Sequence, residues 1–205
     1  MTKVILVRHG HVEGISPERF RGRADLMLTP VGHREAEATA RRIRATWTPA
    51  AVYSSPLNRC LATGEAIGKP LGLAPNPLPG LVDIDYGEWQ GLTPDEVRSR
   101  WPAELDAWYR APHWATIPGG ETLQDVQTRT VSVLRNVIRR HASDVVVVIG
   151  HDSVNRVILL HALDLPLSRY RRLGQDPCAI NEIDFLEEGS TVRSVNETYH
   201  LRHGA

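Results

Sequence analysis

An arginine, a histidine and a glycine, Arg8-His9-Gly10, stand directly after an apolar run near the start of the chain. Arg59 follows a second and shorter run, and His151 follows the most strongly apolar run in the sequence. Runs of this kind are typical of strands buried on both faces of a sheet. Since open α/β sheets bind ligands at the carboxyl ends of their strands, we expect these side chains to share one rim.

Imidazoles beside arginines suit the transfer of a phosphoryl group. Such a group spreads negative charge over its oxygens, and the planar fork of an arginine binds these oxygens in pairs and stays charged. An imidazole with one unprotonated nitrogen can accept the phosphoryl group covalently. A second imidazole, if protonated, adds a donor, and a carboxylic acid with a raised pKa can protonate the leaving oxygen. This scheme needs neither a metal nor a cofactor.

The segments that must position these residues alternate between strands and helices. The expected strands are residues 4–7, 51–53, 145–149, 179–185 and 191–195. The expected helices cover residues 30–46, 55–67 and 153–162, together with a tryptophan-rich region after Thr93 and the longest helix after Thr122. This alternation indicates an α/β fold built on a parallel sheet with right-handed crossovers.

Four of these helices have recognisable start signals. Thr29-Pro30 and Ser55-Pro56 each place a capping residue before a proline, which is well suited to the first helical position. Thr93 and Thr122 are each followed three residues later by an acidic residue, which predicts a capping box.

The bulk composition excludes several classes of protein. The 205 residues, 41% hydrophobic and 23% charged, suffice for one globular domain with its own core. The formal net charge is zero, so no nucleic-acid partner is expected. No apolar stretch approaches the roughly 18 residues of a membrane helix, and the first residues lack a signal-peptide core, so we expect a cytoplasmic protein with no membrane partner. Cys60 and Cys178 lack the spacing of a metal or redox motif.

Five sequence blocks in order resemble the histidine phosphatase superfamily, also called the phosphoglycerate-mutase-like family. The first block is Leu6-Val7-Arg8-His9-Gly10, continued by Arg21-Gly22 with Asp25, Leu28-Thr29 and Gly32. The other four are Ser54-Ser55-Pro56-Leu57-Asn58-Arg59; Gly87-Glu88-Trp89-Gln90-Gly91-Leu92-Thr93; Pro118-Gly119-Gly120-Glu121-Thr122; and Gly150-His151. One Arg-His-Gly triplet would carry little weight, whereas the ordered set is specific. The resemblance implies a three-layer α/β/α sandwich with a mostly parallel central sheet, formed as one domain over residues 1–205, with a helical lid-like insertion at about 93–118.

The resemblance also assigns roles to individual residues. It implies that His9 is phosphorylated during turnover and that Asp83 is the proton donor. It further implies that the remaining residues bind the phosphate or lie close to the substrate: Arg8, Gly10, Arg21, Gly22, Arg59, His151, Asp152 and Ser153. No metal ligand is expected among them, and the expected partner is a small phosphorylated molecule.

Two positions depart from the family pattern. The family usually has Glu where Asp83 stands, and Asp85 competes for the role, although the spacing to Gly87 favours Asp83. The family's phosphate-binding Asn after the signature is missing, which leaves His11 and Glu13 as candidates for the rim of the pocket.

Three alternatives to a phosphatase remain open at this stage. A mutase would return the phosphoryl group to another oxygen of its substrate, although the compact chain favours hydrolysis. A metal-dependent hydrolase could use His9, His11, His151 and Asp152 as ligands. A non-catalytic module could bind a phosphorylated ligand on the same fold. Neither the particular phosphate monoester nor the oligomeric state follows from the sequence, and a homodimer is one of the assemblies left open.

Overall fold

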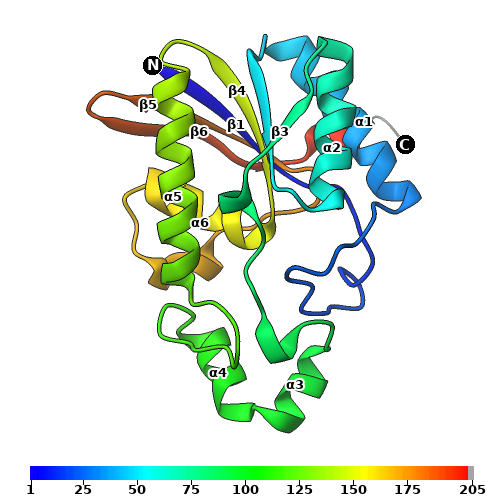
Figure 1. Cartoon of the computed structure of the whole chain (residues 1–205), viewed down its shortest axis with the longest axis vertical. Coiled ribbons are helices and arrows are strands. Elements are labelled where there is room, and N and C mark those ends of the chain that lie inside the picture. The colour runs from blue at the N-terminus through cyan, green and yellow to red at the C-terminus, as the bar shows by residue number, and fades with distance from the viewer. Residues whose placement is uncertain (203–205) are drawn as a thin grey trace.

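The computed structural model describes residues 1–202 and contains one six-stranded sheet of order β3-β2-β4-β1-β5-β6 (Figure 1). The strands are β1 (Thr2–Arg8), β2 (Ala51–Ser54), β3 (Pro75–Pro77), β4 (Val145–Gly150), β5 (Ile180–Leu186) and β6 (Gly189–Glu197). Strands β3, β2, β4 and β1 are parallel neighbours, and β5 pairs antiparallel with both β1 and β6. The expected mostly parallel sheet is confirmed, with β3 as an additional edge strand.

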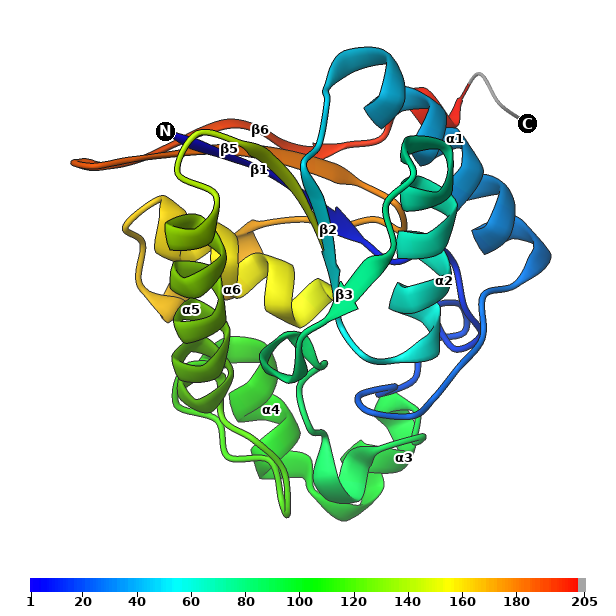
Figure 2. The same ribbon diagram turned by 45° about the horizontal axis from the view of Figure 1, so that its top comes forward.

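Helices cover both faces of this sheet. The α-helices are α1 (Pro30–Thr46), α2 (Asn58–Gly68), α3 (Pro94–Arg100), α4 (Pro102–Arg110), α5 (Leu123–Arg140) and α6 (Asp152–Ala162). Short 3-10 helices lie at Lys69–Leu71, Pro79–Leu81, Gly87–Trp89, Leu167–Arg172 and Tyr199–Leu201. Helices α1 and α2 lie on one face and α5 and α6 on the other, while α3 and α4 extend beyond the carboxyl ends of the parallel strands (Figures 1 and 2).

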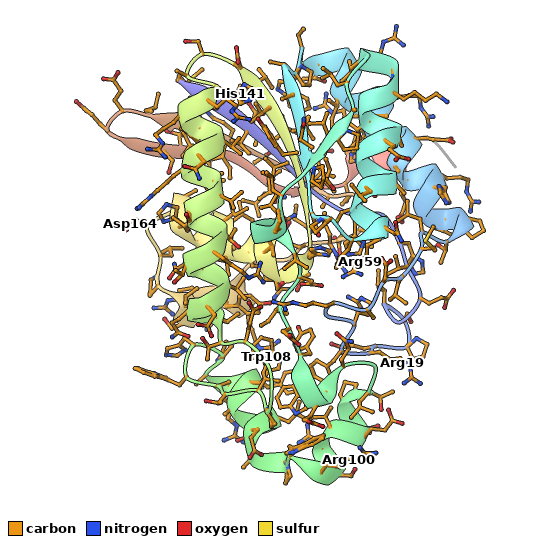
Figure 3. All side chains as sticks on the ribbon, in the orientation of Figure 1. Arg19, Arg59, Arg100, Trp108, His141 and Asp164 are labelled. Carbon is orange, nitrogen blue, oxygen red and sulfur yellow. The ribbon has the colours of Figure 1, made fainter. Side chains whose placement is uncertain are left out.

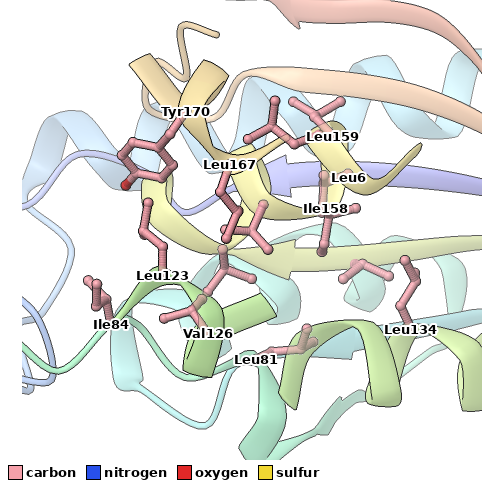
Figure 4. Packing of buried hydrophobic residues seen from close by; sticks show 14 of the residues in the cluster. Leu6, Leu81, Ile84, Leu123, Val126, Leu134, Ile158, Leu159, Leu167 and Tyr170 are labelled. Carbon is pink, nitrogen blue, oxygen red and sulfur yellow. The ribbon is translucent and has the colours of Figure 1, made fainter. Parts of the chain in front are cut away.

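The two faces are packed by alternating residues of the central strands. Val4 and Leu6 of β1 belong to the large core under α5 and α6, part of which is drawn in Figure 4. Ile5 and Val7 belong to the smaller core under α1 and α2. Because successive side chains of a strand point to opposite faces, a continuous apolar run is what a doubly covered sheet requires. The three-layer α/β/α sandwich is therefore confirmed.

The helix start signals hold in three of the four cases. The Thr29 side chain accepts from the Gly32 N–H, and Thr93 and Thr122 each form a capping box with the acidic residue three positions on. The start predicted at Ser55-Pro56 is wrong, because α2 begins at Asn58 and its N-cap residue Leu57 makes no side-chain cap. The Ser55 hydroxyl is engaged with His151 instead, at 2.8 Å from its Nε2.

The tryptophan-rich region forms α3, α4 and the turn after them. Trp108 is buried, and its ring meets those of Tyr86 and Tyr170 edge to face or tilted, with centroids 5.8 Å apart in each case. Trp114 is 79% exposed. Within residues 1–202, no helix combines the length and apolar character needed to span a membrane.

Candidate active site

The ends of strands β1, β2 and β4 bring the predicted catalytic side chains together. Arg8 is the last residue of β1 and His9 follows it, while His151 follows β4. The His9 N–H donates to the Gly150 carbonyl at 3.0 Å, so the two strand ends are joined directly. The imidazole rings of His9 and His151 lie 5.2 Å apart in an edge-on arrangement, and both residues are at most 1% exposed.

The proton on His9 is located by its hydrogen bond. Nδ1 lies 2.8 Å from the Gly10 carbonyl oxygen, and a carbonyl can only accept, so Nδ1 carries the proton. Nε2 is then the unprotonated nitrogen. Burial holds the pKa of His9 well below its ordinary value, and the neighbouring His151 imidazole and the charges of Arg59 and Arg8 lower it further. His9 is therefore a neutral imidazole with one lone pair available.

His151 is neutral as well, in the opposite tautomer. Arg59 Nε donates to its Nδ1 at 3.2 Å, which leaves the proton on Nε2, and this N–H donates to Ser55 Oγ. Burial, followed by the charges of Arg59 and Arg8, lowers the pKa of His151 well below its ordinary value. The protonated second imidazole that the sequence argument allowed for is thus not the state found here.

Arg59 is fully buried and holds the floor of the site. Besides His151, its guanidinium donates at 2.6 Å to the carbonyls of both Gly22 and Ala24 and contacts Asp83 Oδ2 at 3.2 Å. Figure 3 shows it at the start of α2, facing the N-terminal loop that carries Arg19. The same side chain therefore orients the second imidazole, the acidic residue and this loop. Gly22 has φ +48°, a left-handed conformation that favours glycine.

Asp83 contacts Arg59, the arginine that binds the His151 imidazole, and it also contacts helix α6. Its Oδ1 accepts from the Ile84 N–H at 2.9 Å and from the Ser153 hydroxyl, and its Oδ2 lies 3.6 Å from His151 Nδ1. Asp85, the competing acid, turns away from the site, because its carboxylate contacts Arg23 at 3.1 Å and caps the Gly87 N–H. The shorter side chain at position 83 thus still reaches the buried cluster.

Arg8 and Gly10 complete the end of β1. Arg8 Nη1 donates to the Gln175 carbonyl, and its buried Nε has no hydrogen-bond partner in the described structure. A Cβ on Gly10 would lie 2.5 Å from the Gly32 carbonyl oxygen at the start of α1, which is closer than real contacts allow. Glycine is therefore required here so that the loop can pack against the helix.

A cavity of about 70 Å³ opens above Asp83. Its lining consists of Glu18, Arg19, Phe20, Arg21, Gly22, Asp83, Tyr86, Asp152 and Ser153. Four of the predicted substrate-binding residues thus line it, whereas His9, Arg59 and His151 are not part of its lining and are at most 1% exposed. No residue of the predicted lid-like segment 93–118 lines this cavity; the wall opposite α6 comes from the N-terminal loop.

The two rim candidates that replace the family pattern lie outside the cavity. His11 Nδ1 is 2.9 Å from Thr29 Oγ1, and its backbone N–H donates to Glu35 at 2.7 Å, so His11 joins the loop to the N-terminus of α1. Glu13 is exposed. Sequence reasoning missed Ser55 and Tyr86, although both stand inside or beside the blocks that carry the resemblance.

Across residues 1–202 the structure has no group of three or more His, Cys, Asp or Glu side chains placed to hold a metal ion. Of the ligands considered for a metal-dependent hydrolase, His11 is held by Thr29 and Asp152 by Arg156.

Parallel strands that deliver a neutral, oriented imidazole and two arginines to one rim define a phosphoryl-transfer enzyme of the histidine type. The chain belongs to the histidine phosphatase superfamily (branch 1), whose profile matches residues 4–198. It is a histidine-phosphatase-type phosphatase.

Related proteins and solved structures agree with this assignment. The chain is 30% identical over 201 residues to phosphoserine phosphatase 1 of Hydrogenobacter thermophilus, covering 98% of this chain and 95% of that protein. It is 31% identical over 163 residues to a metal-independent phosphoserine phosphatase of Arabidopsis thaliana, covering 78% of this chain and 68% of that protein. The structure of Bacillus stearothermophilus YhfR superposes with a TM-score of 0.92 at 26% identity, covering 98% of this chain and 100% of the other.

Proposed function

We propose that the chain hydrolyses a small phosphate monoester without a metal, through a phosphohistidine on His9. The observation that carries this proposal is the state of His9. Its Nδ1–H is fixed by the Gly10 carbonyl, so the lone pair is on Nε2, and its lowered pKa keeps the ring neutral. A neutral imidazole with a defined lone pair is a competent nucleophile for in-line phosphoryl transfer.

In the first step, His9 Nε2 attacks the phosphorus and the bond to the leaving oxygen breaks. Asp83 gives its proton to that oxygen, so the alcohol departs neutral and Asp83 becomes a carboxylate. Arg8 and Arg59 neutralise the oxygens of the transferring group. In the second step, water attacks the phosphohistidine, Asp83 takes the proton from the water, and His9 regains its lone pair as inorganic phosphate leaves.

The size of the cavity supports a small leaving group. About 70 Å³ lies next to Asp83, where the leaving oxygen would be protonated. Since a cavity needs roughly 10–15 Å³ of such volume to hold one water molecule, this space has room for a leaving group of a few heavy atoms. Relatives named as phosphoserine phosphatases make phosphoserine the first substrate to test.

The test is phosphate release from phospho-L-serine and from p-nitrophenyl phosphate in excess EDTA, comparing the native chain with His9→Ala. We expect turnover in EDTA by the native chain, loss of turnover in the variant, and circular dichroism spectra that show both proteins folded. Turnover that EDTA abolishes, or that survives His9→Ala, would contradict the mechanism. Trapping ³²P on the native chain but not on His9→Ala would identify the phosphorylated residue.

Each alternative function predicts a different result in the same assay. A mutase would convert 3-phosphoglycerate to its 2-isomer faster than it releases phosphate, and a binding module would bind phosphate esters without turnover.

The unpaired, buried cysteines Cys60 and Cys178 agree with the proposed cytoplasmic location, where thiols stay reduced. Sedimentation of the purified chain will decide whether it forms the homodimer that the sequence left open.

A further inference from the structure

Four charged side chains on the cavity wall have no role in the phosphoryl-transfer steps. Glu18 and Arg19 are exposed, whereas Arg21 and Asp152, which carry opposite charges, are partly buried. Arg21 comes from the N-terminal loop, and Asp152 is the first residue of α6. Both line the cavity beside Asp83 and Ser153, where the leaving group would lie. Whatever group the substrate carries beyond its ester oxygen therefore has to meet a guanidinium and a carboxylate.

Arg21 is a largely buried cation without a counter-ion. Its Nη1 donates to the carbonyls of Gly14 and Arg19, which are neutral acceptors. Its Nε is buried and has no hydrogen-bond partner, and within residues 1–202 no carboxylate lies within ion-pair distance of its guanidinium. A guanidinium with unused donors in a cavity is suited to bind a planar carboxylate in two-point fashion.

Asp152 keeps one carboxylate oxygen for a ligand. Arg156 contacts it from one turn further along α6, with Nε at 3.1 Å and Nη2 at 3.0 Å, and both contacts use Oδ1. In the described structure no hydrogen bond or ion pair uses Oδ2. Arg156 thus fixes the carboxylate while its second oxygen stays able to accept from a cationic donor.

Tyr86 lines the same small cavity as the two charges. Its pKa is raised well above the ordinary value by burial first, then by Tyr170, Asp83 and Asp152, whereas Arg21 acts on it in the opposite direction. The cavity that Arg21, Tyr86 and Asp152 share has a volume of about 70 Å³, so one ligand of a few atoms inside it can meet both charges.

We propose that Arg21 and Asp152 form an amino-acid subsite, in which Arg21 binds the α-carboxylate and Asp152 the α-ammonium of a phosphorylated amino acid. The inference rests on the proposed function, since it assigns the leaving group of that same reaction. A leaving group with only a carboxylate leaves Asp152 unmatched beside it, and one with only an ammonium leaves Arg21 unmatched. A zwitterion matches both in a space where water cannot fully screen them.

The test compares three small substrates on the same two-carbon ester arm that differ in which of these charges they carry: phospho-L-serine with both, phosphoethanolamine with the ammonium, and 3-phosphooxypropanoate with the carboxylate. We expect the native chain to prefer phospho-L-serine at least tenfold in kcat/KM over each of the others. Arg21→Gln should lower kcat/KM for phosphoserine and 3-phosphooxypropanoate at least tenfold more than for phosphoethanolamine. Asp152→Asn should lower kcat/KM for phosphoserine and phosphoethanolamine at least tenfold more than for the substrate that carries only the carboxylate.

Arg98→Gln, on an exposed position of α3, is the matched control and should change all three values by one common factor. Circular dichroism checks that each variant is folded. A native chain without preference for the zwitterion, or variants that lower all three substrates equally, would overturn the amino-acid subsite. Hydrolysis of p-nitrophenyl phosphate that depends on His9 keeps the proposed function in that case, whereas no turnover of any substrate overturns both.

Discussion

Replacing Ser55 by alanine tests whether a buried hydroxyl behind the site fixes the proton on His151. Ser55 is fully buried just after β2, and its Oγ lies 2.8 Å from His151 Nε2. Because Arg59 Nε already donates to Nδ1, the neutral ring must donate its own proton from Nε2 to Ser55. In Ser55→Ala the remaining neighbour of this N–H in the described chain is Cys60 Sγ at 3.5 Å, a weak acceptor.

The size of the effect follows from the cost of an unpaired buried donor. Leaving an N–H without its partner in the interior costs about 1–3 kcal/mol. We expect Ser55→Ala to lower the free energy of unfolding by ~1–2 kcal/mol, since the Cys60 sulfur recovers part of this cost. An imidazole that is no longer held aligns less well with the transferring group, so kcat should fall ~10–100-fold, or about 1.4–2.7 kcal/mol. KM should change less, because Arg8 is untouched.

The assay measures kcat and KM with p-nitrophenyl phosphate, urea unfolding, and the ¹⁵N chemical shifts of His151. Ser54→Ala is the matched control, since Ser54 is equally buried and donates to the Ser55 carbonyl at 2.8 Å without touching the imidazole. The shifts should report a defined Nε2–H in the native chain and in Ser54→Ala, and a mixture of tautomers in Ser55→Ala. Equal losses of kcat in the two variants, or an unchanged tautomer in Ser55→Ala, would refute the reasoning.

Four further outcomes follow from the same geometry. Because the pKa of His9 lies well below its ordinary value, kcat/KM should persist at pH 5.5, where an unperturbed imidazole would be only about one-tenth neutral; a tenfold loss in a pH–rate profile would contradict this. His9 and His151 are neutral in the folded chain, whereas in the unfolded chain they take up protons below about pH 6.5. The stability that these two groups contribute should therefore be fully present above that pH, and the free energy of unfolding should fall below it by up to ~2.7 kcal/mol per pH unit. Urea melts at pH 7 and 5.5 will show this difference. Asp83→Asn should lower kcat ~10²–10⁴-fold for phosphoserine and far less for p-nitrophenyl phosphate, whose leaving group needs no proton, so equal losses would argue against Asp83 as the acid. Gly10→Ala should lower the melting temperature strongly, since its Cβ would meet the Gly32 carbonyl at 2.5 Å, and a melting temperature equal to that of the native chain would show that this approach can relax.

Local patterns in the sequence were sufficient to predict the sheet and most helices. The run at residues 145–149 lies in the sheet interior because its residues alternate between two cores, and the caps at Thr29, Thr93 and Thr122 form as predicted because each needs only residues within one turn. Strand β3 was not predicted, since Pro75–Pro77 is short and proline-rich. Proline is tolerated at a sheet edge, which is where β3 lies.

What could not be predicted depends on contacts between distant segments. The start of α2 was placed at Ser55 because the sequence cannot show that His151, 96 positions away, engages its hydroxyl. The tautomer of His151 is likewise set by Arg59. The same arginine binds the Gly22 carbonyl and so holds the loop that forms part of the cavity wall. Residue types along the chain identify which groups can do chemistry, whereas their protonation states follow from partners that only the folded chain brings together.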